Sequence, residues 1–400
     1  MKKRLLLASL LICATTSVFA DDSFQWHGYY RAGLGMADDL SNINKNSNEV
    51  HSLGRYGLEY DDFVAASLSK RWTDAKGQWS QYNFSYNVFD YSEDGTNAVN
   101  TYGTKVNTLD STDNYVEMGG LTFLPKDSSM WVGKRRIASG INLLDEDYKK
   151  FNGRGIGYSS KNFDINFFKE LEAGDMGEYG DIFTLDGTLK FKNANIEGTF
   201  TKLTEDFSIP YVDSGEKGDT SLSVLAEYKS SNFLGFTKGN TTYRAQFGKG
   251  VTADKLNMAV ITDEKDIAYR FTADSSIMIK NWIVNTVVNY ESSKDDSANI
   301  TYSTLSVVGR GTKKLTDNIS MIYEAALTNK SNVDFEGTPS GNADGTAYKL
   351  VAGPAVQLDT MPWVRPIIRT TVTLIGGDKE VTNLDDTSEL RLGAQFETYF

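Results

Sequence analysis

The chain has 400 residues, of which 12% are aromatic and 24% are charged, and its formal net charge at neutral pH is −12. This acidic balance argues against nucleic acid and against anionic lipid head groups as partners. With one cysteine and two histidines, the sequence offers no Cys/His cluster for zinc and no thiol chemistry. We therefore expect neither a metal nor a cofactor.

The first 20 residues are predicted to be a cleavable secretory signal peptide. A basic start, Lys2–Arg4, precedes the apolar run Leu5–Ala14, and Val18–Ala20 is similar to a cleavage site. The apolar run is too short to cross a bilayer as a helix. Cleavage would remove three basic residues and Cys13, which leaves residues 21–400 with a net charge of −15 and no cysteine. We expect this remainder to form a single domain.

Two regions near the start of this domain alternate between apolar and polar residues, a period of two that predicts β-strands with two different surroundings. The first predicted strand is Phe24 to Gly35, with Phe24, Trp26, Gly28, Tyr30 and Ala32 on one face and Gln25, His27, Tyr29 and Arg31 on the other. The second predicted strand runs from Arg55 through Arg71. Its apolar face carries Tyr56, Leu58, Tyr60 and Val64, and its other face carries Arg55, Gly57, Glu59, Asp61 and Phe63.

Similar segments recur along the chain, and many are separated by clusters of Asp, Asn, Gly, Ser and Lys that predict turns or loops. They cover residues 82–88, 163–167, 222–228, 243–247, 267–273, 282–290, 300–308, 321–327 and 368–374. No sustained period of 3.6 residues indicates a helical domain. With about 10 residues per membrane-spanning strand, either 16 or 18 strands fit the 380 residues that follow the predicted cleavage site.

The last twelve residues, Glu389–Phe400, show the alternation most clearly. Leu390, Leu392, Ala394, Phe396, Thr398 and Phe400 share one face, opposite Arg391, Gly393, Gln395, Glu397 and Tyr399. A terminal aromatic residue on the apolar face is typical of outer-membrane barrels, whose last strand closes against the first. An edge strand of a soluble β-sandwich is the alternative. We predict an all-β protein, a transmembrane antiparallel β-barrel in the outer membrane of a Gram-negative bacterium.

Five blocks of the sequence resemble the maltoporin family of sugar-specific porins. They are Trp26-His-Gly-Tyr-Tyr-Arg31, Arg55-x-Gly-x-Glu59 with Phe63, Leu124-Pro125 with Trp131-Val-Gly-Lys-Arg135, Trp363-Val-Arg-Pro-Ile-Ile-Arg369, and Gly393-Ala-Gln-Phe-Glu-Thr-Tyr-Phe400. The blocks follow the family's order, whereas residues 159–350 match only faintly. Two features depart from the family. No cysteine is left for its loop disulfide, and its third-loop Arg-x-Asp positions fall at Ser139 and Ile141.

The resemblance implies an 18-stranded barrel with an inward-folded constriction loop, assembled as a homotrimer in outer-membrane lipid. It implies a channel, not an enzyme, through which an oligosaccharide (maltose, maltodextrins or a related sugar) diffuses along an aromatic track and past a charged constriction. Two alternatives stay open. One is a non-specific porin for small solutes and ions; the other is an outer-membrane barrel enzyme that uses His27, although no nucleophile motif accompanies that histidine.

The predicted site residues combine the resemblance with the faces of the predicted strands. The sugar-stacking track consists of Tyr29, Phe63, Trp363 and Tyr399, which share the polar, water-facing side of their strands. The polar constriction, which exchanges hydrogen bonds with sugar hydroxyls, consists of Arg31, Arg55, Arg135, Glu59, Glu146 and Tyr148. On the alternative interpretation, these charges only balance one another inside the barrel.

Two further expectations concern aromatic residues. Because the first and last strands are neighbours in a closed barrel, Tyr29 and Tyr399 should lie close together. Four other large aromatic residues are assigned to lipid-facing belts or to the barrel wall. They are Trp26, Trp131, Trp282 and Phe400.

Overall fold

The computed structural model describes most of the chain from residue 24 to residue 400. The described residues are 24–38, 52–58, 62–90, 110–141, 143–144, 146–170, 182–203, 220–250, 267–295, 300–333, 343–359, 365–382, 384 and 386–400. The predicted signal peptide and two predicted site residues, Glu59 and Trp363, lie outside them.

Eighteen β-strands make up most of the described residues. The first nine are β1 (Phe24–Ala37), β2 (Asp62–Thr73), β3 (Trp79–Asp90), β4 (Asp110–Gly119), β5 (Ser129–Ile141), β6 (Glu146–Ser159), β7 (Phe163–Glu170), β8 (Ile182–Lys190) and β9 (Ala194–Leu203). The other nine are β10 (Thr220–Phe233), β11 (Thr237–Lys249), β12 (Ile267–Ile279), β13 (Trp282–Asp295), β14 (Ile300–Lys314), β15 (Ile319–Val333), β16 (Ala343–Gln357), β17 (Ile367–Gly377) and β18 (Ser388–Tyr399). A short helix, α2 (Lys379–Thr382), lies between the last two strands. Within the described part of the chain, no helix is long and apolar enough to cross a membrane.

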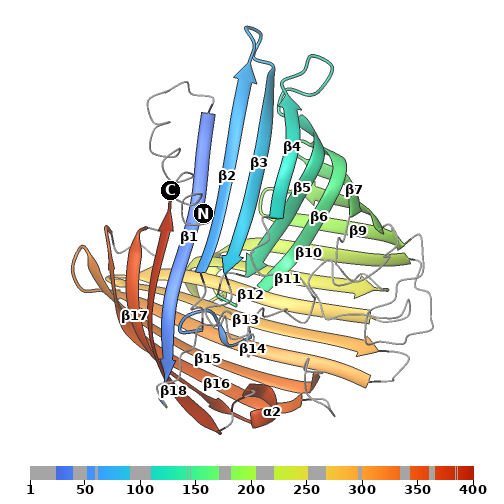
Figure 1. Cartoon of the computed structure of the whole chain (residues 1–400). Helices are drawn as coiled ribbons and strands as arrows, with labels where there is room; N and C mark the ends of the chain where they lie inside the picture. The colour runs from blue at the N-terminus through green and yellow to red at the C-terminus, as the bar shows by residue number, and fades with distance from the viewer. Residues whose placement is uncertain are drawn as a thin grey trace.

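The strands form one closed antiparallel sheet. Each strand pairs with the next strand in the sequence, and β1 pairs with both β2 and β18, so the sheet closes on itself. In Figure 1, strands β2–β5 and β12–β15 belong to different walls and cross steeply, as the tilt of strands in a barrel requires. The predicted antiparallel barrel is confirmed, and the described residues form 18 strands rather than 16.

The two faces of the wall have opposite chemistry. On β10, Leu222 and Val224 are exposed on the outer face, whereas Ser221, Ser223 and Glu227 are buried on the inner face. Alternation of apolar-out and polar-in residues is the pattern of a barrel whose outer face meets lipid. The same alternation holds on β17 and β18, as the period of two predicted.

The connections between strands differ in length on the two rims of the barrel. On one rim, β6–β7, β8–β9 and β12–β13 are joined by two or three residues, at 160–162, 191–193 and 280–281. On the opposite rim, the connections include residues 204–219 and 250–266. Outer-membrane barrels have short turns towards the periplasm and long loops towards the outside. By this rule the short-turn rim, where β1 begins and β18 ends, faces the periplasm.

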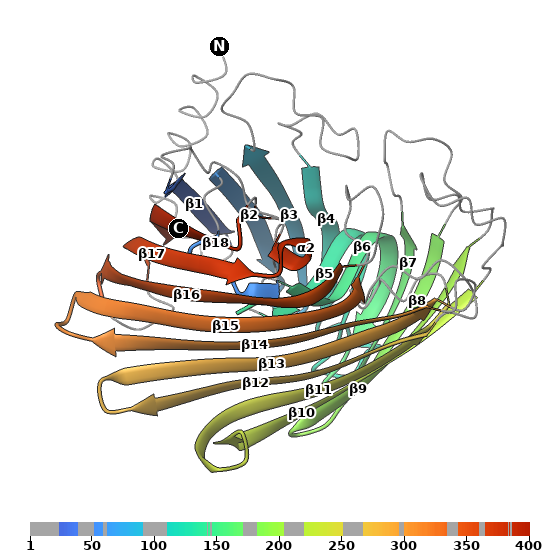
Figure 2. The same ribbon diagram turned by 90° about the horizontal axis from the view of Figure 1, so that it is seen from below.

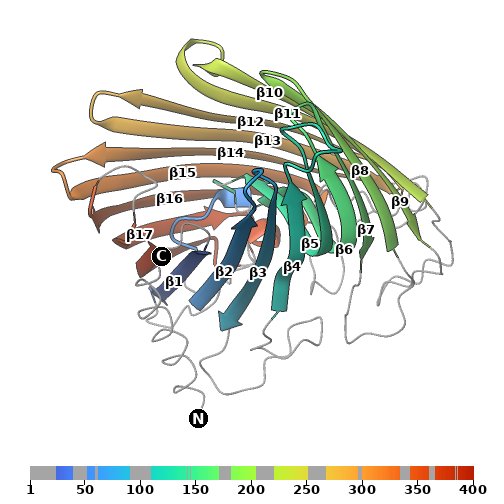
Figure 3. The same ribbon diagram turned by 90° about the horizontal axis from the view of Figure 1, so that it is seen from above.

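Residues 52–58 lie inside the barrel, and this corrects the predicted start of the second strand. β2 begins at Asp62, not at Arg55. The segment forms turns that bury Leu53 and Leu58, and Figures 2 and 3 show it in blue within the ring of strands. The alternation of apolar and polar residues there reflects a small apolar cluster inside the barrel, not lipid outside it.

The tip of the β5–β6 hairpin completes this internal cluster. Ile141, Leu143 and Leu144 are buried against Leu53 and Leu58. The backbone N–H of Arg55 donates a hydrogen bond of 3.2 Å to the carbonyl of Leu143, so the hairpin tip and the 52–58 segment are joined directly. The inward-folded loop implied by the resemblance is therefore this hairpin tip, and residues 52–58 narrow the lumen together with it.

The seam between the first and last strands gives the first testable prediction. The backbones of Gly28 and Phe400 exchange two hydrogen bonds, of 2.6 and 2.9 Å, and the Phe400 ring lies 6.5 Å from that of Trp26. Gly28 leaves room for this ring, since a Cβ atom there would lie 2.1 Å from it.

Deleting Phe400 removes the last pair of the seam and should lower the fraction of protein that migrates as a folded barrel on gels without boiling. Phe236→Ala, at a turn residue that is 89% exposed, is the control and should behave like the unmodified chain. Equal assembly of the deletion and the control would contradict the prediction.

Candidate functional site

Three aromatic rings meet on the inner face where β18, β1 and β2 lie side by side. The ring centroid of Tyr29 is 5.3 Å from that of Tyr399 and 5.7 Å from that of Phe63. The strand register produces this contact, because Tyr29 pairs directly with Tyr399 and the neighbouring Arg31 pairs with Phe63. The expected proximity of Tyr29 and Tyr399 is confirmed. We call Tyr29, Phe63 and Tyr399 the aromatic cluster.

Charged groups surround the aromatic cluster. The carboxylate of Glu397 accepts hydrogen bonds from the Tyr29 hydroxyl at 3.0 Å, from Arg365 at 3.0 Å and from Arg369 at 2.7 Å. The guanidinium of Arg365 lies 5.3 Å from the Tyr399 ring centroid, and that of Arg31 lies 5.6 Å from the centroid of Phe63. The arrangement thus joins apolar ring faces to donors and acceptors on the same stretch of wall.

Tyr56 is a further aromatic residue inside the barrel, and the sequence did not reveal its position there. Its predicted place was on the apolar face of a strand, but it lies in the internal segment. The guanidinium carbon of Arg310 is 3.4 Å from its ring centroid, and that of Arg369 is 4.4 Å from it. Because Arg369 also binds Glu397, this arginine connects Tyr56 to the charges beside the aromatic cluster. The only sequence signal was a tyrosine next to a predicted constriction arginine.

A buried ion network fixes the internal segment to strands β14, β15 and β16 of the wall. Lys349 is fully buried, and its ammonium group donates hydrogen bonds to the carbonyls of Gly54 at 2.6 Å and Tyr56 at 2.7 Å. The same group lies 2.8 Å from the carboxylate of Glu324, which also accepts a hydrogen bond of 2.7 Å from Arg310. Buried charges are tolerated when they are paired and hydrogen-bonded in this way. We call Lys349, Glu324 and Arg310 the anchor network.

The first residues of β6, after the hairpin tip, contact strands β8, β9 and β11 through a second set of interactions. The ring centroid of Tyr148 lies 4.2 Å from the guanidinium of Arg244, and the carbonyl of Tyr148 accepts a hydrogen bond of 2.7 Å from Gln246. Lys149 forms ion pairs with Glu197 at 2.8 Å and with Asp186 at 3.6 Å. Tyr148, a predicted constriction residue, is therefore half-buried against the wall within this set.

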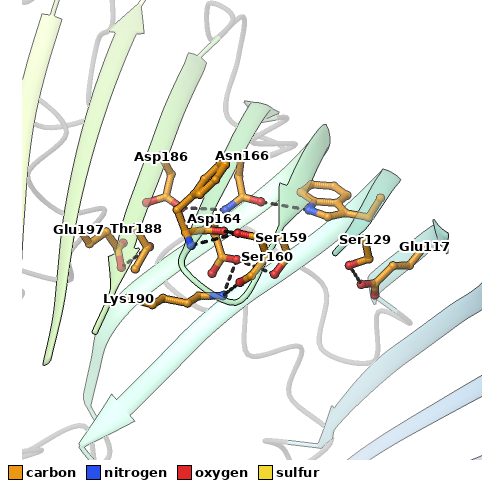
Figure 4. Close-up of polar contacts among 12 residues, drawn as sticks. Glu117, Ser129, Ser159, Ser160, Asp164, Asn166, Asp186, Thr188, Lys190 and Glu197 are labelled. Carbon is orange, nitrogen blue, oxygen red and sulfur yellow. Dashed lines mark hydrogen bonds and ion pairs between the residues drawn. The ribbon is translucent and has the colours of Figure 1, made fainter. Parts of the chain in front are cut away.

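Arg135 belongs to a different cluster. Its guanidinium lies 4.7 Å from the ring centroid of Tyr115 and 5.2 Å from that of Trp131. Trp131 is buried on the inner face of the wall rather than in a lipid-facing belt. Its indole N–H donates to Asn166 at 3.0 Å, and Asn166 donates in turn to Asp186 at 2.9 Å. Figure 4 shows Asn166 and Asp186 joined by a dashed line on neighbouring strands. The structure thus shows Arg135 packed against wall aromatics.

Of the remaining predicted residues, the structure describes the side chains of some and not of others. Arg31 is buried beside the aromatic cluster, and Arg55 interacts electrostatically with Glu397. Glu146 begins β6, but its side chain lies outside the described part of the structure, as do Glu59 and Trp363. The structure brings together Tyr29, Phe63, Tyr399 and Arg31, with Arg55 near their charged partner. Arg365, Arg369 and Glu397 join them, although they were not among the predicted site residues.

Comparisons with known proteins identify the family of this chain. The family model described as LamB porin matches residues 24–400. The protein named maltoporin of Hahella chejuensis is 23% identical and aligns over 100% of this chain and 98% of its own length. Maltoporin 1 of Aeromonas salmonicida is 21% identical, with 100% of each chain covered.

Solved structures show the same fold at low identity. The anion-selective porin from Comamonas acidovorans superimposes with a TM-score of 0.51 at 10% identity, over 94% of this chain and 99% of that one. OprD from Pseudomonas aeruginosa gives a TM-score of 0.50 at 8% identity, over 94% of each chain. The closed 18-stranded barrel and the family match over residues 24–400 show that the chain belongs to the LamB porin family, the porins of the outer membrane.

Proposed function

We propose that this porin is a sugar-specific channel, in which an oligosaccharide diffuses past Tyr399, Tyr29 and Phe63. The observation that carries the proposal is the contact of these three rings on the inner face, with Glu397, Arg365 and Arg31 beside them. Aromatic rings that face the water inside the barrel require an explanation, and stacking against sugar rings would provide it. Trp363, two residues before Arg365, is expected to extend the track.

The chemistry of a sugar matches this wall. A pyranose ring has apolar C–H faces and polar hydroxyl edges, so it can stack on an aromatic ring while its edges bind arginine and carboxylate groups. Each stacking contact should contribute about 0.5–1.5 kcal/mol, on the scale of aromatic pairs. A few such contacts, less the cost of immobilising the sugar, give roughly −4 to −6 kcal/mol, which is millimolar to high-micromolar affinity. Weak binding suits a channel, because the sugar must also leave.

Two relatives that are named maltoporin and cover the whole chain support a sugar as the substrate. Assembly as a homotrimer and export by a cleaved signal peptide belong to the same proposal. The main alternative is a non-specific pore, in which the aromatic cluster only packs. The anion-selective porin has the same fold, but a likeness at 10% identity supports no choice between these functions.

Block of ion current by sugars tests the proposal. Single channels in planar bilayers should be blocked by at least one member of a panel of maltodextrins, β-glucoside oligomers and amino-sugar oligomers. Half-maximal block is expected at roughly high-micromolar to millimolar sugar, the range estimated above. Polyethylene glycol of the same size is the control for simple obstruction. If no sugar blocks the current more than the polymer does, the chain is a diffusion pore.

A further inference from the structure

Arg71 and Trp79 lie against each other at the short-turn rim, near the end of β2 and at the start of β3. The guanidinium carbon of Arg71 is 4.0 Å from the Trp79 ring centroid, and its Nε donates a hydrogen bond of 3.0 Å to Gln81. The Trp79 ring lies over Gly119 of β4, since a Cβ atom there would come within 2.5 Å of the ring. An indole and a guanidinium are thus held together against the wall. We call Arg71 and Trp79 the rim pair.

The rim pair faces the inside of the barrel. Arg71 follows Phe63, the β2 member of the aromatic cluster, by an even number of positions, and residues two apart on a strand share a face. Arg71 pairs with Gln81, and Trp79 lies two residues before Gln81 on β3. By contrast, Trp72 has the outward parity and is 53% exposed. The rim pair therefore meets solutes that pass through the barrel and not the lipid around it.

The guanidinium of Arg71 is fixed in place but keeps hydrogen-bond donors for another group. Within the described residues, Arg71 contacts Trp79 and Gln81 and forms no ion pair. The carboxylate nearest to it in sequence, that of Asp74, accepts two hydrogen bonds of 2.8 Å from backbone N–H groups of its own turn. The terminal nitrogens of Arg71 can therefore donate to a ligand. Because the side chain is already oriented, little further order is lost when it binds.

A polar stretch of wall joins the aromatic cluster to the rim pair. Strands β1, β2 and β3 lie side by side, as Figure 1 shows, and they carry both groups. Hydroxyl, amide and imidazole side chains hold inward positions between the two groups. They include His27, Ser67, Ser69 and Asn83. Such side chains both donate and accept hydrogen bonds, so the hydroxyl groups of a sugar can exchange partners along this wall.

We propose, on the basis of the proposed function, that the rim pair is a second sugar-binding subsite, which holds one end of an oligosaccharide while another part is still on the aromatic cluster. The rim pair repeats the chemistry of the cluster, where an arginine also lies beside each of two rings, at 5.6 and 5.3 Å from the ring centroids. The indole offers an apolar face to the C–H side of a sugar, and the guanidinium donates to its hydroxyl groups.

The distance between the two subsites makes chain length the signature of this proposal. Ala65 pairs with Tyr29 of the aromatic cluster. Arg71 lies six residues further along β2, which is roughly 20 Å at about 3.3 Å per residue. A trisaccharide is too short to reach both subsites, whereas a heptasaccharide spans them. For the longer sugar the second contact is intramolecular, so it adds to the affinity.

Single-channel current block by maltotriose and maltoheptaose tests the assignment, or β-glucoside oligomers of the same lengths if these block the unmodified channel better. The variant combines Arg71→Gln with Trp79→Ala. The concentration of the heptasaccharide that halves the current should rise about tenfold, because one stacking and hydrogen-bonding site is lost. The trisaccharide should block the variant and the unmodified channel equally.

The matched control combines Trp72→Ala with Lys76→Gln. It removes an outward-facing indole and an exposed lysine from the same rim, and it should leave the block by both sugars unchanged. Arg71→Gln alone changes an exposed side chain. This single variant should give a smaller rise for the heptasaccharide, and it serves if the double variant does not fold.

Two results would overturn the subsite alone. If the double variant and the control bind the heptasaccharide equally, the rim pair only packs against the wall. If the double variant weakens the block by both sugars to the same extent, the effect comes from a change at the aromatic cluster and not from a second subsite. Absence of block by any sugar in the unmodified channel is a different outcome, because it overturns the proposed function and this inference with it.

Discussion

Replacing Lys349 with methionine is expected to widen the pore while the barrel itself still forms. The side chain is fully buried and holds the internal segment at two carbonyls, those of Gly54 and Tyr56. Methionine fills similar space but donates no hydrogen bond. Removing one partner of a buried ion network costs about 3–5 kcal/mol, and here much of that loss falls on the attachment of residues 52–58. The segment should leave its position and stop narrowing the lumen.

The measurement is single-channel conductance together with the temperature at which the folded barrel is lost on gels. Conductance should rise and this temperature should fall. Glu324→Gln should change both in the same direction, because Glu324 loses its charge opposite Lys349 and Arg310. Lys229→Met is the control, since that side chain is 63% exposed. If Lys349→Met lowers heat stability but leaves conductance unchanged, residues 52–58 do not form the narrowest part of the channel.

The sequence was most informative where period-two alternation fixes register locally. Tyr29 and Arg31 were placed on the inner face from β1 alone, and Tyr399 from β18 alone. Closure of the barrel then makes Tyr29 and Tyr399 neighbours without further information. The number of strands could not be counted from the pattern, because short strands such as β7 and β8 give only a few alternating positions each.

The same alternation failed where apolar residues face inward. A period of two shows that two surroundings differ, but it does not say which of them is lipid. Leu58 packs on an apolar cluster inside the barrel, and Trp131 is buried against Phe168 on the inner face. Both residues have the chemistry of a lipid-facing position. Telling them apart requires the path of the chain between strands, which local sequence does not contain.

The anchor network was also beyond reach of the sequence. Arg310, Glu324 and Lys349 lie on β14, β15 and β16, and their meeting depends on the register of three strands joined by connections of different lengths. Each residue alone looks like any charged side chain facing water. The contact that gives Lys349 its role is with backbone carbonyls almost 300 positions earlier in the chain. No spacing rule connects such groups.

Replacing Tyr29 and Tyr399 together with alanine is expected to weaken sugar binding about tenfold or more, since 1.4 kcal/mol is one decade in affinity. Two stacking contacts are lost, and Glu397 also loses the hydrogen bond from the Tyr29 hydroxyl. Ion conductance should be kept or raised, because two bulky rings leave the lumen. The measurement is the sugar concentration that halves the single-channel current, taken with the sugar that blocks the unmodified channel best.

The same two strands supply a matched control on the opposite face of the wall. Tyr30 and Phe396 are also neighbours on β1 and β18, with ring centroids 6.1 Å apart, but they carry the outward parity. Replacing both with alanine removes an aromatic pair of similar size from the same seam. That variant should keep its sugar affinity, while any loss of barrel stability should be comparable in the two double variants. If the inner pair and the outer pair lower sugar affinity equally, the effect comes from a weakened seam. If neither does so, the aromatic cluster has no part in sugar binding.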